Sequence, residues 1–370
     1  MTENSSALSD SDDFFLNANY LQFIENNPPK DFTFCYLTFE QNHRMVGFMA
    51  CQIKYFSAAQ SLNFEQNENK SLPFKKWLAE KVAYNTLIVG NLMLTGDHSF
   101  FFKKDTLNFD EKKQLFTEGV NFAKQKLADQ GTKINAVFIK DFELGSDNHR
   151  LIQSLEDYNE FQVEPNFVFN LRKEWQNFDD YLDALSSKYR VRAKRAFKKR
   201  QTLEFKEFNV ERIIAYKDRI YTLYEQVCSN SAVNLIQLNP NYFVNLKNEF
   251  EDDFKLFGYL KDNQLLGFFT TLRNGEELEA HFLGYEMSQN APYQIYLNML
   301  FEIVKQGIDT RVKRIVFART AHEIKSSIGA EAIEMSLFFK HENCLFNHVL
   351  PLTLPILSPR EKWTPRQPFK

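Results

Sequence analysis

The sequence predicts an α+β fold in which one order of strands and helices occurs twice along 370 residues. The first observation is a pair of hairpin patterns, apolar runs around a short polar turn, at 32–54 and 254–272. The second is an amphipathic helix pattern after each hairpin, at 109–130 and at about 292–308. The third is a short apolar strand pattern on both sides of each helix. Together they predict mixed, mostly antiparallel sheets flanked by helices.

The first half predicts a hairpin around the polar turn 41–44, then a third strand, a long helix and two further strands. Gly131 ends the helix pattern, because glycine accepts the backbone conformation that follows a last helical turn. The ranges predicted after the hairpin are 85–94, 109–130, 134–139 and 161–171.

The second half predicts the same elements in the same order. The Asn274-Gly275 turn separates the hairpin from the third strand. The predicted ranges are 254–260, 264–272, 277–286, about 292–308, 314–318, 321–328 and 332–339.

Between the halves, Asn177 predicts a helix N-cap, and apolar residues at helical spacing continue to Phe197. The chain is therefore expected to divide into five parts. These are a disordered lead-in at 1–13, a first domain at 14–172, a connecting basic helix at 173–201, a second domain at 202–350 and a Pro-rich extended tail at 351–370.

Several enzyme classes are excluded by missing motifs. The 12 glycines never lie two apart, so no dinucleotide-binding or kinase glycine loop exists, and no GK[ST] forms a phosphate loop. There is no GxSxG, and His322-Glu323 lacks the second histidine of HExxH. The four cysteines form no CxxC, so no metal site is predicted, and they fit a reducing compartment.

Charge and hydropathy argue against further classes of protein. Lys and Arg number 45 against 48 Asp and Glu, which argues against a globally basic nucleic-acid binder. The beginning of the sequence has no signal-peptide pattern, and no apolar run approaches the ~18 residues of a membrane span. We therefore expect a cytoplasmic protein without a membrane span.

Three segments carry a resemblance to a known family. They are the run from 178–182 to 188–195, His281-Phe282-Leu283-Gly284-Tyr285, and 319–325 followed by Gly329. With the repeated element order, they resemble the tandem GNAT (acyl-CoA N-acyltransferase) proteins of the FemABX type, which include peptidoglycan-biosynthesis acyltransferases. The resemblance covers about residues 30–345 in pattern, and it is strongest at 178–200 and 277–330.

The resemblance implies an N-acyltransferase with two GNAT-like domains. An amine would attack a thioester or ester donor directly, without a covalent enzyme intermediate. The donor would be acyl-CoA, acyl-carrier protein or aminoacyl-tRNA, used as a co-substrate and not bound tightly. The donor pyrophosphate would bind at the start of the helix after the third strand. Here that start contains Asn290 and Tyr293, without the glycines of the usual GNAT loop.

The predicted reaction centre lies in the second domain, and the first is expected to be structural. Period-two alternation places Glu279, His281, Leu283 and Tyr285 on one face of the third strand. A Glu–His pair can take a proton from an ammonium group, and the ordinary histidine pKa of ~6.5 suits that role. The alternative is a histidine held by structural hydrogen bonds.

A second group of candidates begins the short helix at 321–328. Thr320 and Glu323 fit a capping box, which leaves Arg319, His322 and Lys325 for donor or substrate binding. In many GNAT enzymes a tyrosine at the position of Lys325 protonates the leaving thiolate, so the resemblance makes Lys325 the candidate acid. We expect a cleft between this group and Glu279/His281, opened where the third strand splays near Gly284.

The run 188–200 holds eight Lys or Arg in thirteen residues and no acid. Arg190, Arg192, Lys194 and Arg195 are the residues expected to hold a polyanionic donor. Two alternatives remain open. The run is a solvated helix face, or the protein is a non-catalytic GNAT-like module that binds nucleic acid or a protein through it.

Overall fold

The computed structural model describes residues 12–57, 83–229, 236–348 and 363–370. The described chain divides into two compact units. Unit 1 holds the residues up to 164, with 236–238 and 334–348. Unit 2 holds 165–229, 239–333 and 363–370. Because the first and second halves of the chain contribute to both units, each unit is described by itself.

The sheet of unit 1 begins with the predicted hairpin, β1 (Phe32–Gln41) and β2 (Arg44–Ser57). Strand β3 (Ala83–Val89) pairs antiparallel with β2 and parallel with β5 (Ala136–Glu143). The later part of β12 (Glu331–His341) pairs antiparallel with β5. The first part of β6 (Asn159–Asn170) follows β12 in the strand order, and the short β4 (Phe100–Phe102) pairs with β2.

Both faces of the unit 1 sheet are covered, and β2 shows why. Its Met49 and Cys51 pack in one core with the long helix α5 (Phe109–Asp129) and with α6 (Asp147–Gln153). Its Phe48 and Ala50 point to the opposite face and pack with residues of η1 (Phe14–Leu16) and α2 (Ala18–Asn26). Helix α5 coincides with the predicted helix and ends before Gly131, whose φ is +87°.

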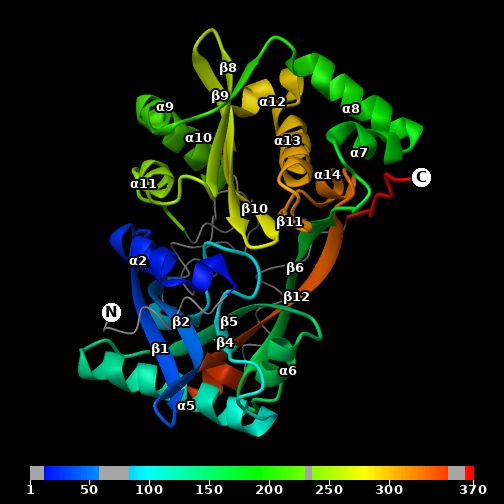
Figure 1. The fold of residues 1–370 in the computed structure, drawn as a ribbon. Coiled ribbons are helices and arrows are strands. Elements are labelled where there is room, and N and C mark those ends of the chain that lie inside the picture. Colours follow the sequence, from blue (N-terminus) through cyan, green and yellow to red (C-terminus); the bar gives the residue numbers. More distant parts are fainter. Residues whose placement is uncertain (1–11, 58–82, 230–235, 349–362) are drawn as a thin grey trace, which may run out of the picture. The chain divides into compact units, whose positions relative to one another are not determined.

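The sheet of unit 2 runs from β6 through β11 (Arg314–Val316), β10 (Glu277–Tyr285), β9 (Gln264–Asn274) and β8 (Phe254–Lys261) to β7 (Glu204–Glu207). All of its described neighbours are antiparallel except β10 and β11, which are parallel. Figure 1 shows the three long strands β8, β9 and β10 side by side in yellow-green.

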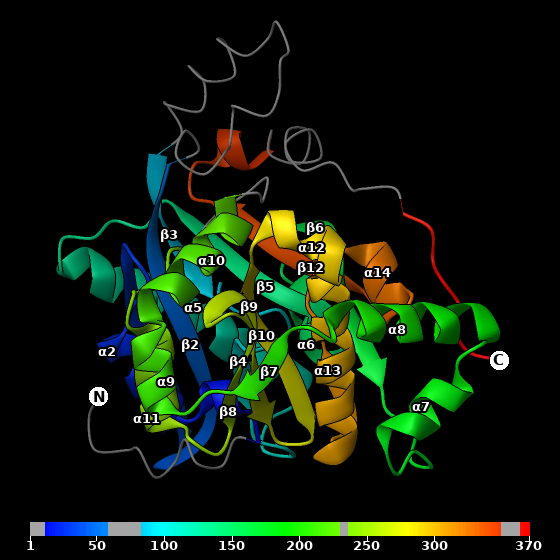
Figure 2. The same cartoon turned by 90° about the horizontal axis from the view of Figure 1, so that it is seen from above.

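Helices cover both faces of β8–β10 (Figures 1 and 2). On one side lie α9 (Val210–Ala215), α10 (Lys217–Ser229) and α11 (Tyr242–Glu249). A Cβ at Gly284 would lie 2.5 Å from the Leu223 carbonyl carbon, so α10 packs directly on β10 and only glycine fits. On the other side lie α12 (Met287–Tyr293) and α13 (Ile295–Asp309). A Cβ at Gly267 would lie 2.9 Å from both Ile295 and Met299 of α13.

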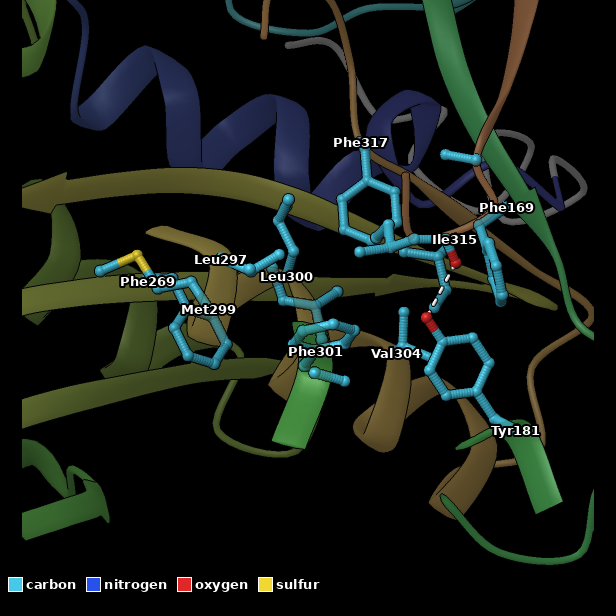
Figure 3. Packing of buried hydrophobic residues seen from close by; sticks show 14 of the residues in the cluster. Phe169, Tyr181, Phe269, Leu297, Met299, Leu300, Phe301, Val304, Ile315 and Phe317 are labelled. Carbon is cyan, nitrogen blue, oxygen red and sulfur yellow. Dashed lines mark hydrogen bonds between the residues drawn. The ribbon is translucent and has the colours of Figure 1, made fainter. Parts of the chain in front are cut away.

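The main core of unit 2 lies on the α13 side (Figure 3). Aromatic residues of β6 and β9, Phe169 and Phe269, pack with the apolar face of α13. The side chain of Tyr181 from α7 (Phe178–Ala184) is fully buried, and its hydroxyl donates to the Ile328 carbonyl at 2.9 Å. Helix α8 (Ser187–Arg200) closes this corner through Ala193 and Ala196.

The predicted elements occur in the predicted order, with two differences among the helices and several further elements for which no range was predicted. The predicted helix from Asn177 is two helices, because the backbone of Leu185 is extended (φ −67°, ψ 141°) between α7 and α8. Asn177 does cap the first, with a capping box to Asp180. The helix expected at about 292 begins at Ile295, since Gln294 has left-handed φ, and α12 precedes it. The elements without a predicted range are η1, α2, β4, α6, β7, α9, α10 and α11.

The last strand of each half of the chain pairs in the other unit. Residues 335–341 of β12 pair with β5 of unit 1, and residues 168–170 of β6 pair with β11 of unit 2. The domain boundaries expected at 172/173 and 201/202 follow the chain, whereas the compact units exchange these strands. Within the described residues, no helix is both long enough and apolar enough to cross a bilayer.

The predicted lead-in at 1–13 lies outside the described residues except for its last two positions. The predicted tail at 351–370 is described only over 363–370, where it is extended and has one strand bridge, Phe369 with Leu185.

Candidate active site

Strands β10 and β11 of unit 2 pair over a short stretch and then separate. Their parallel pairing joins Glu277–Glu279 to Arg314–Val316 and ends there. Strand β10 continues to Tyr285, but from Ala280 onward it pairs only with β9 among the described strands. Strand edges present N–H and C=O groups that can bind another extended chain. The separation expected near Gly284 thus begins five residues earlier, after Glu279.

A β-bulge changes which way the side chains of β10 point. The register with β9 shifts between Ala280 and Leu283. The hydroxyl of Thr270 on β9 accepts from the Phe282 N–H at 2.9 Å and donates to the Phe282 carbonyl at 3.0 Å. Thr270 is fully buried, so these bonds stabilise the bulge without competition from water.

The bulge corrects the predicted face of β10. Leu283 and Tyr285 pack against the core on the α13 side, as do Leu278 and Ala280. His281 instead contacts Tyr242 of α11, on the opposite face. The period-two prediction therefore holds only up to the bulge, because one extra residue reverses the alternation after it.

His281 is half-buried and is held by a hydrogen bond to α11. Its Nε2 lies 2.9 Å from the hydroxyl oxygen of Tyr242, which is fully buried. Burial lowers the pKa of His281 to about 3. The imidazole is therefore neutral at pH 7, and its Nε2 shares a hydrogen bond with the Tyr242 hydroxyl. Glu279 is buried, and it lies at the last rung of β10–β11 pairing, beside Val316.

The connection from β11 to α14 (His322–Ser326) has an unusual backbone. Ala318, Thr320 and Ala321 all have left-handed φ, between +51° and +69°, although none is glycine. Such residues cost on the order of 1 kcal/mol each and persist where the surroundings hold them, often at functional sites. The predicted capping box is wrong, because left-handed Ala321 is the N-cap, no side chain caps the helix and Glu323 pairs with Arg366.

The Lys325 side chain stabilises this connection by hydrogen bonds to its backbone carbonyls. This side chain is buried, and its Nζ donates to the Ala318 carbonyl at 3.1 Å and to the Arg319 carbonyl. Burial lowers the pKa of Lys325 to about 7. A neutral amine has two N–H groups and a lone pair, so the two carbonyls use both hydrogens and leave the lone pair available.

The side chains that were predicted to form one cluster lie in two different environments. His281 contacts Tyr242 and Phe282, whereas Lys325 contacts the 318–319 carbonyls and lies 5.9 Å from the centre of the Phe167 ring. Within the described residues, these hydrogen bonds and ring contacts of the two side chains share no residue. His322 is buried beside the Lys325 group, stacked on Phe167 at 5.5 Å. Arg319 belongs to the left-handed connection itself, half-buried.

No protein-family model matches the chain, and no curated protein matches its sequence. Solved structures do match it. The crystal structure of FemX aligns over 96% of this chain and 98% of its own, with a TM-score of 0.57 and 11% identity. L-PGS from Bacillus licheniformis aligns over 92% and 96%, with a TM-score of 0.51 and 11% identity. A tandem GNAT protein from the clavulanic acid biosynthesis pathway aligns over 87% and 86%, with a TM-score of 0.50 and 8% identity.

The chain has the tandem GNAT fold. This confirms the fold class and the structural resemblance predicted from the sequence. Identities of 8–11% show a shared fold and leave the activity of this chain to be argued from its own residues.

In a tandem GNAT fold the start of α13 is the position expected for a donor pyrophosphate. Asn290 lies within α12, but its Oδ1 accepts from the Tyr296 N–H in the first turn of α13 at 3.0 Å. It therefore occupies one of the amides that an anion would use. The hydroxyl of Tyr293 accepts from Lys261 Nζ at 2.8 Å.

Asn298, which sequence reasoning missed, joins this corner of the fold. Its Nδ2 lies within 3.1 Å of three carbonyl oxygens, those of Ala196 in α8, Tyr293 and Gln294. The available sequence signal was the Asn within the apolar stretch 295–301, because a polar side chain on a buried face needs hydrogen-bond partners. Asn298 fixes α8 against the start of α13.

The basic run forms α8, and the structure separates its cations into two kinds. Arg200 pairs with Glu302 of α13 and lies over the rings of Phe197 and Tyr259, so it stabilises packing. Arg190 pairs with Asp183 at 3.1 Å. Arg192, Lys194 and Arg195 are exposed and have no ion pair within the described chain; Lys188, Lys198 and Lys199 are exposed too. No group of three or more His, Cys, Asp or Glu residues in the described ranges is arranged to hold a metal ion.

Proposed function

We propose that unit 2 transfers an acyl or aminoacyl group from a thioester or ester donor to an amine. The observation that carries this proposal is the end of β10–β11 pairing at Glu279 and Val316. It leaves an edge of β10 without a described strand partner, at the point where the left-handed connection after β11 begins. Backbone N–H groups at such an edge can hold an extended donor arm and stabilise an oxyanion.

The proposed reaction needs two proton transfers. The amine nitrogen attacks the donor carbonyl carbon, and the C–S or C–O bond of the donor then breaks. Glu279 is proposed to take the proton that the amine nitrogen loses as its bond to the acyl carbon forms, with His281 as a neutral hydrogen-bonding neighbour on the same face. Lys325 is proposed to give a proton to the leaving group, because a pKa of about 7 makes it a competent acid near neutral pH.

Donor binding is proposed at three places. Arg319, His322 and Lys325 offer cationic or N–H groups for an anionic part of donor or acceptor. Asn290 and Tyr293 border the start of α13. Arg192, Lys194 and Arg195 form the exposed part of the predicted polyanion site, with Arg190 at its edge. Acyl-CoA, acyl-carrier protein and aminoacyl-tRNA all remain candidate donors.

The test is an acyl-transfer assay with each donor class and a mixture of primary amines, read by mass spectrometry of the products. Lys325→Gln is expected to lower kcat/KM about 10²-fold or more, the usual loss for a proton-transfer group. Lys247→Gln is the matched control, since Lys247 is also buried and its Nζ donates to the Glu251 and Phe254 carbonyls at 2.9 and 3.1 Å. Absence of any acylated amine with folded protein contradicts the proposal.

The exposed cations of α8 favour a second candidate, a non-catalytic module that binds a polyanion. Changing Arg192, Lys194 and Arg195 to Glu separates the two. If the protein is an enzyme, donor KM rises and the effect weakens with salt, since the Debye length is ~8 Å at 0.15 M. If it is a binding module, RNA or protein binding is lost and no transfer is seen in the parent. Glu substitutions at exposed Lys104, Lys126 and Lys133 control for net charge.

A further inference from the structure

The segment from Trp363 to Lys370 is bonded to the helix that carries Lys325. The Ser326 hydroxyl accepts from the Arg366 N–H at 2.7 Å and donates to the Arg366 carbonyl at 3.1 Å. The Arg366 guanidinium pairs with Glu323 at 2.7 Å. Ser326 and Glu323 flank Lys325 in α14, so three contacts fix both sides of that residue to one point of the segment.

The same segment covers the aromatic residues beside Lys325. The Trp363 ring lies 5.2 Å from the Phe167 ring and 5.6 Å from the His322 ring. Phe167 is also the ring over which Lys325 Nζ lies. The segment therefore contacts α14 through hydrogen bonds at Ser326 and through rings at His322.

The far end of the segment is anchored in the core. A Cβ at Gly329 would lie 2.5 Å from the Phe369 ring, so glycine makes room for that ring. Phe369 lies 5.7 Å from Trp175 and 6.1 Å from Tyr181. The Pro368 carbonyl accepts from the N–H of Ser186, the N-cap residue of α8, at 2.8 Å.

Helix α14 needs such support from outside. It has five residues, no side-chain cap and a left-handed connection before it. A helix of one or two turns does not hold its own conformation, because nucleation costs more than its few hydrogen bonds return. The contacts that keep Lys325 beneath the 318–319 carbonyls are therefore tertiary ones, and the 363–370 segment supplies several of them.

We infer that residues 363–370 form a clamp that positions Lys325, with Ser326 as the positioning residue through which it acts. The role in catalysis rests on the proposed function, whereas the clamp itself is a structural claim about the Lys325 amine. The clamp joins α14 to the first turn of α8, so the predicted proton donor and the cationic helix are held by one segment.

The test compares two adjacent serines. Ser326→Ala removes both bonds to Arg366, while Ser327→Ala removes a bond within α14, from its hydroxyl to the Ile324 carbonyl at 2.7 Å. Both serines are buried. The readout is acetylation of the Lys325 amine by a soluble N-hydroxysuccinimide ester, measured by peptide mass spectrometry and normalised to exposed Lys194.

Lys325 labelling is expected to rise about tenfold in Ser326→Ala, the factor that one or two hydrogen bonds contribute to a local opening equilibrium. It is expected to stay within about twofold of the parent in Ser327→Ala. Equal labelling in the two variants overturns the clamp. If Ser326→Ala does not fold, Arg366→Gln, which breaks the ion pair to Glu323, serves in its place, and unchanged labelling there overturns the clamp as well.

Activity gives an independent readout. Where the parent transfers acyl groups, Ser326→Ala is expected to lower kcat with little change in donor KM, and Ser327→Ala to change neither. Altered labelling without parent activity supports the clamp and contradicts the proposed function. Acyl transfer by the parent together with unaltered Lys325 labelling in Ser326→Ala supports the proposed function and contradicts the clamp.

Discussion

Lys325 is a buried titratable residue of unit 2 and His281 a half-buried one, and desolvation lowers the pKa of each. For Lys325 the value is about 7, below the ordinary 10.5, so its neutral form is favoured in the folded state. For His281 it is about 3, below the ordinary 6.5. Lys325 can therefore exchange a proton near neutral pH, whereas His281 cannot. Of these two predicted proton-transfer residues, only Lys325 therefore has a pKa suited to that role near pH 7.

Lys325 should make stability depend on pH. Between about pH 7 and 10.5 the unfolded chain holds a proton on this amine that the folded chain lacks, so stability rises with pH across that window. The free-energy difference between the parent and Lys325→Met, from urea unfolding, is expected to grow by up to about 1.4 kcal/mol per pH unit. Lys194→Met controls for the lost charge. A difference that stays flat from pH 7 to 10 contradicts the lowered pKa.

His281 should remain neutral across the physiological range. Its ring resonances are expected to show no titration between pH 5 and pH 8 by NMR. Because the folded pKa of about 3 lies below the unfolded value of 6.5, the contribution of His281 to stability falls as pH drops through that window. A midpoint near 6.5 in the folded protein would show that His281 can act as the base.

At the scale of elements, the β10 bulge determines on which face of the sheet each side chain of β10 lies. It turns His281 toward α11 and returns Leu283 and Tyr285 to the α13 core. The Thr270 hydroxyl is what bonds the displaced Phe282 backbone. Sequence patterns predicted the strand but not the bulge, because one inserted residue leaves the apolar pattern readable on either register.

Thr270→Val tests the bulge with a near-isosteric change. Without the hydroxyl, the Phe282 N–H and carbonyl lose their side-chain hydrogen-bond partner, which is expected to cost about 1–3 kcal/mol of stability. Amide exchange at 281–283 should speed up. Thr271→Val is the matched control, because that buried hydroxyl bonds Gln306 and not β10. Equal exchange at 281–283 in both variants means that Thr270 does not hold the bulge.

Other elements show what a sequence can specify. Helix α5 was predicted to the residue at its start and to one residue at its end, since the apolar periodicity and Gly131 both agree with the structure. The break at Leu185–Ser186 was missed because apolar spacing runs through it unchanged. The capping box at Thr320 failed because a tertiary partner, Arg366, holds Glu323. The carbonyl partners of Lys325 depend on left-handed residues that have no sequence signal.

At the scale of the whole molecule, the exchanged strands set how the chain can be divided. Phe338 of β12 belongs to the core of unit 1, and Phe167 and Phe169 of β6 belong to the core of unit 2. A fragment cut at the end of either half therefore lacks a strand of its own core. Local patterns predicted every strand involved but could not predict which strand it would pair with.

The exchange predicts that residues 14–172 do not fold alone. Without β12, one edge of β5 and the cavity left by Phe338 are exposed, so the fragment should lack cooperative unfolding and dispersed NMR signals. Adding residues 173–370 in trans is expected to restore both. A fragment that unfolds cooperatively by itself would contradict the role given to β12.

The central claim is that unit 2 binds an acyl donor and passes its acyl group directly to an amine. Native mass spectrometry tests it most directly, applied to the purified protein and to the protein mixed with acyl-CoA, acyl-carrier protein or aminoacyl-tRNA. The claim predicts a non-covalent complex with the intact mass of one donor class, which disappears when an acceptor amine is added. A covalent acyl adduct on the protein, or no complex with any donor, would contradict it.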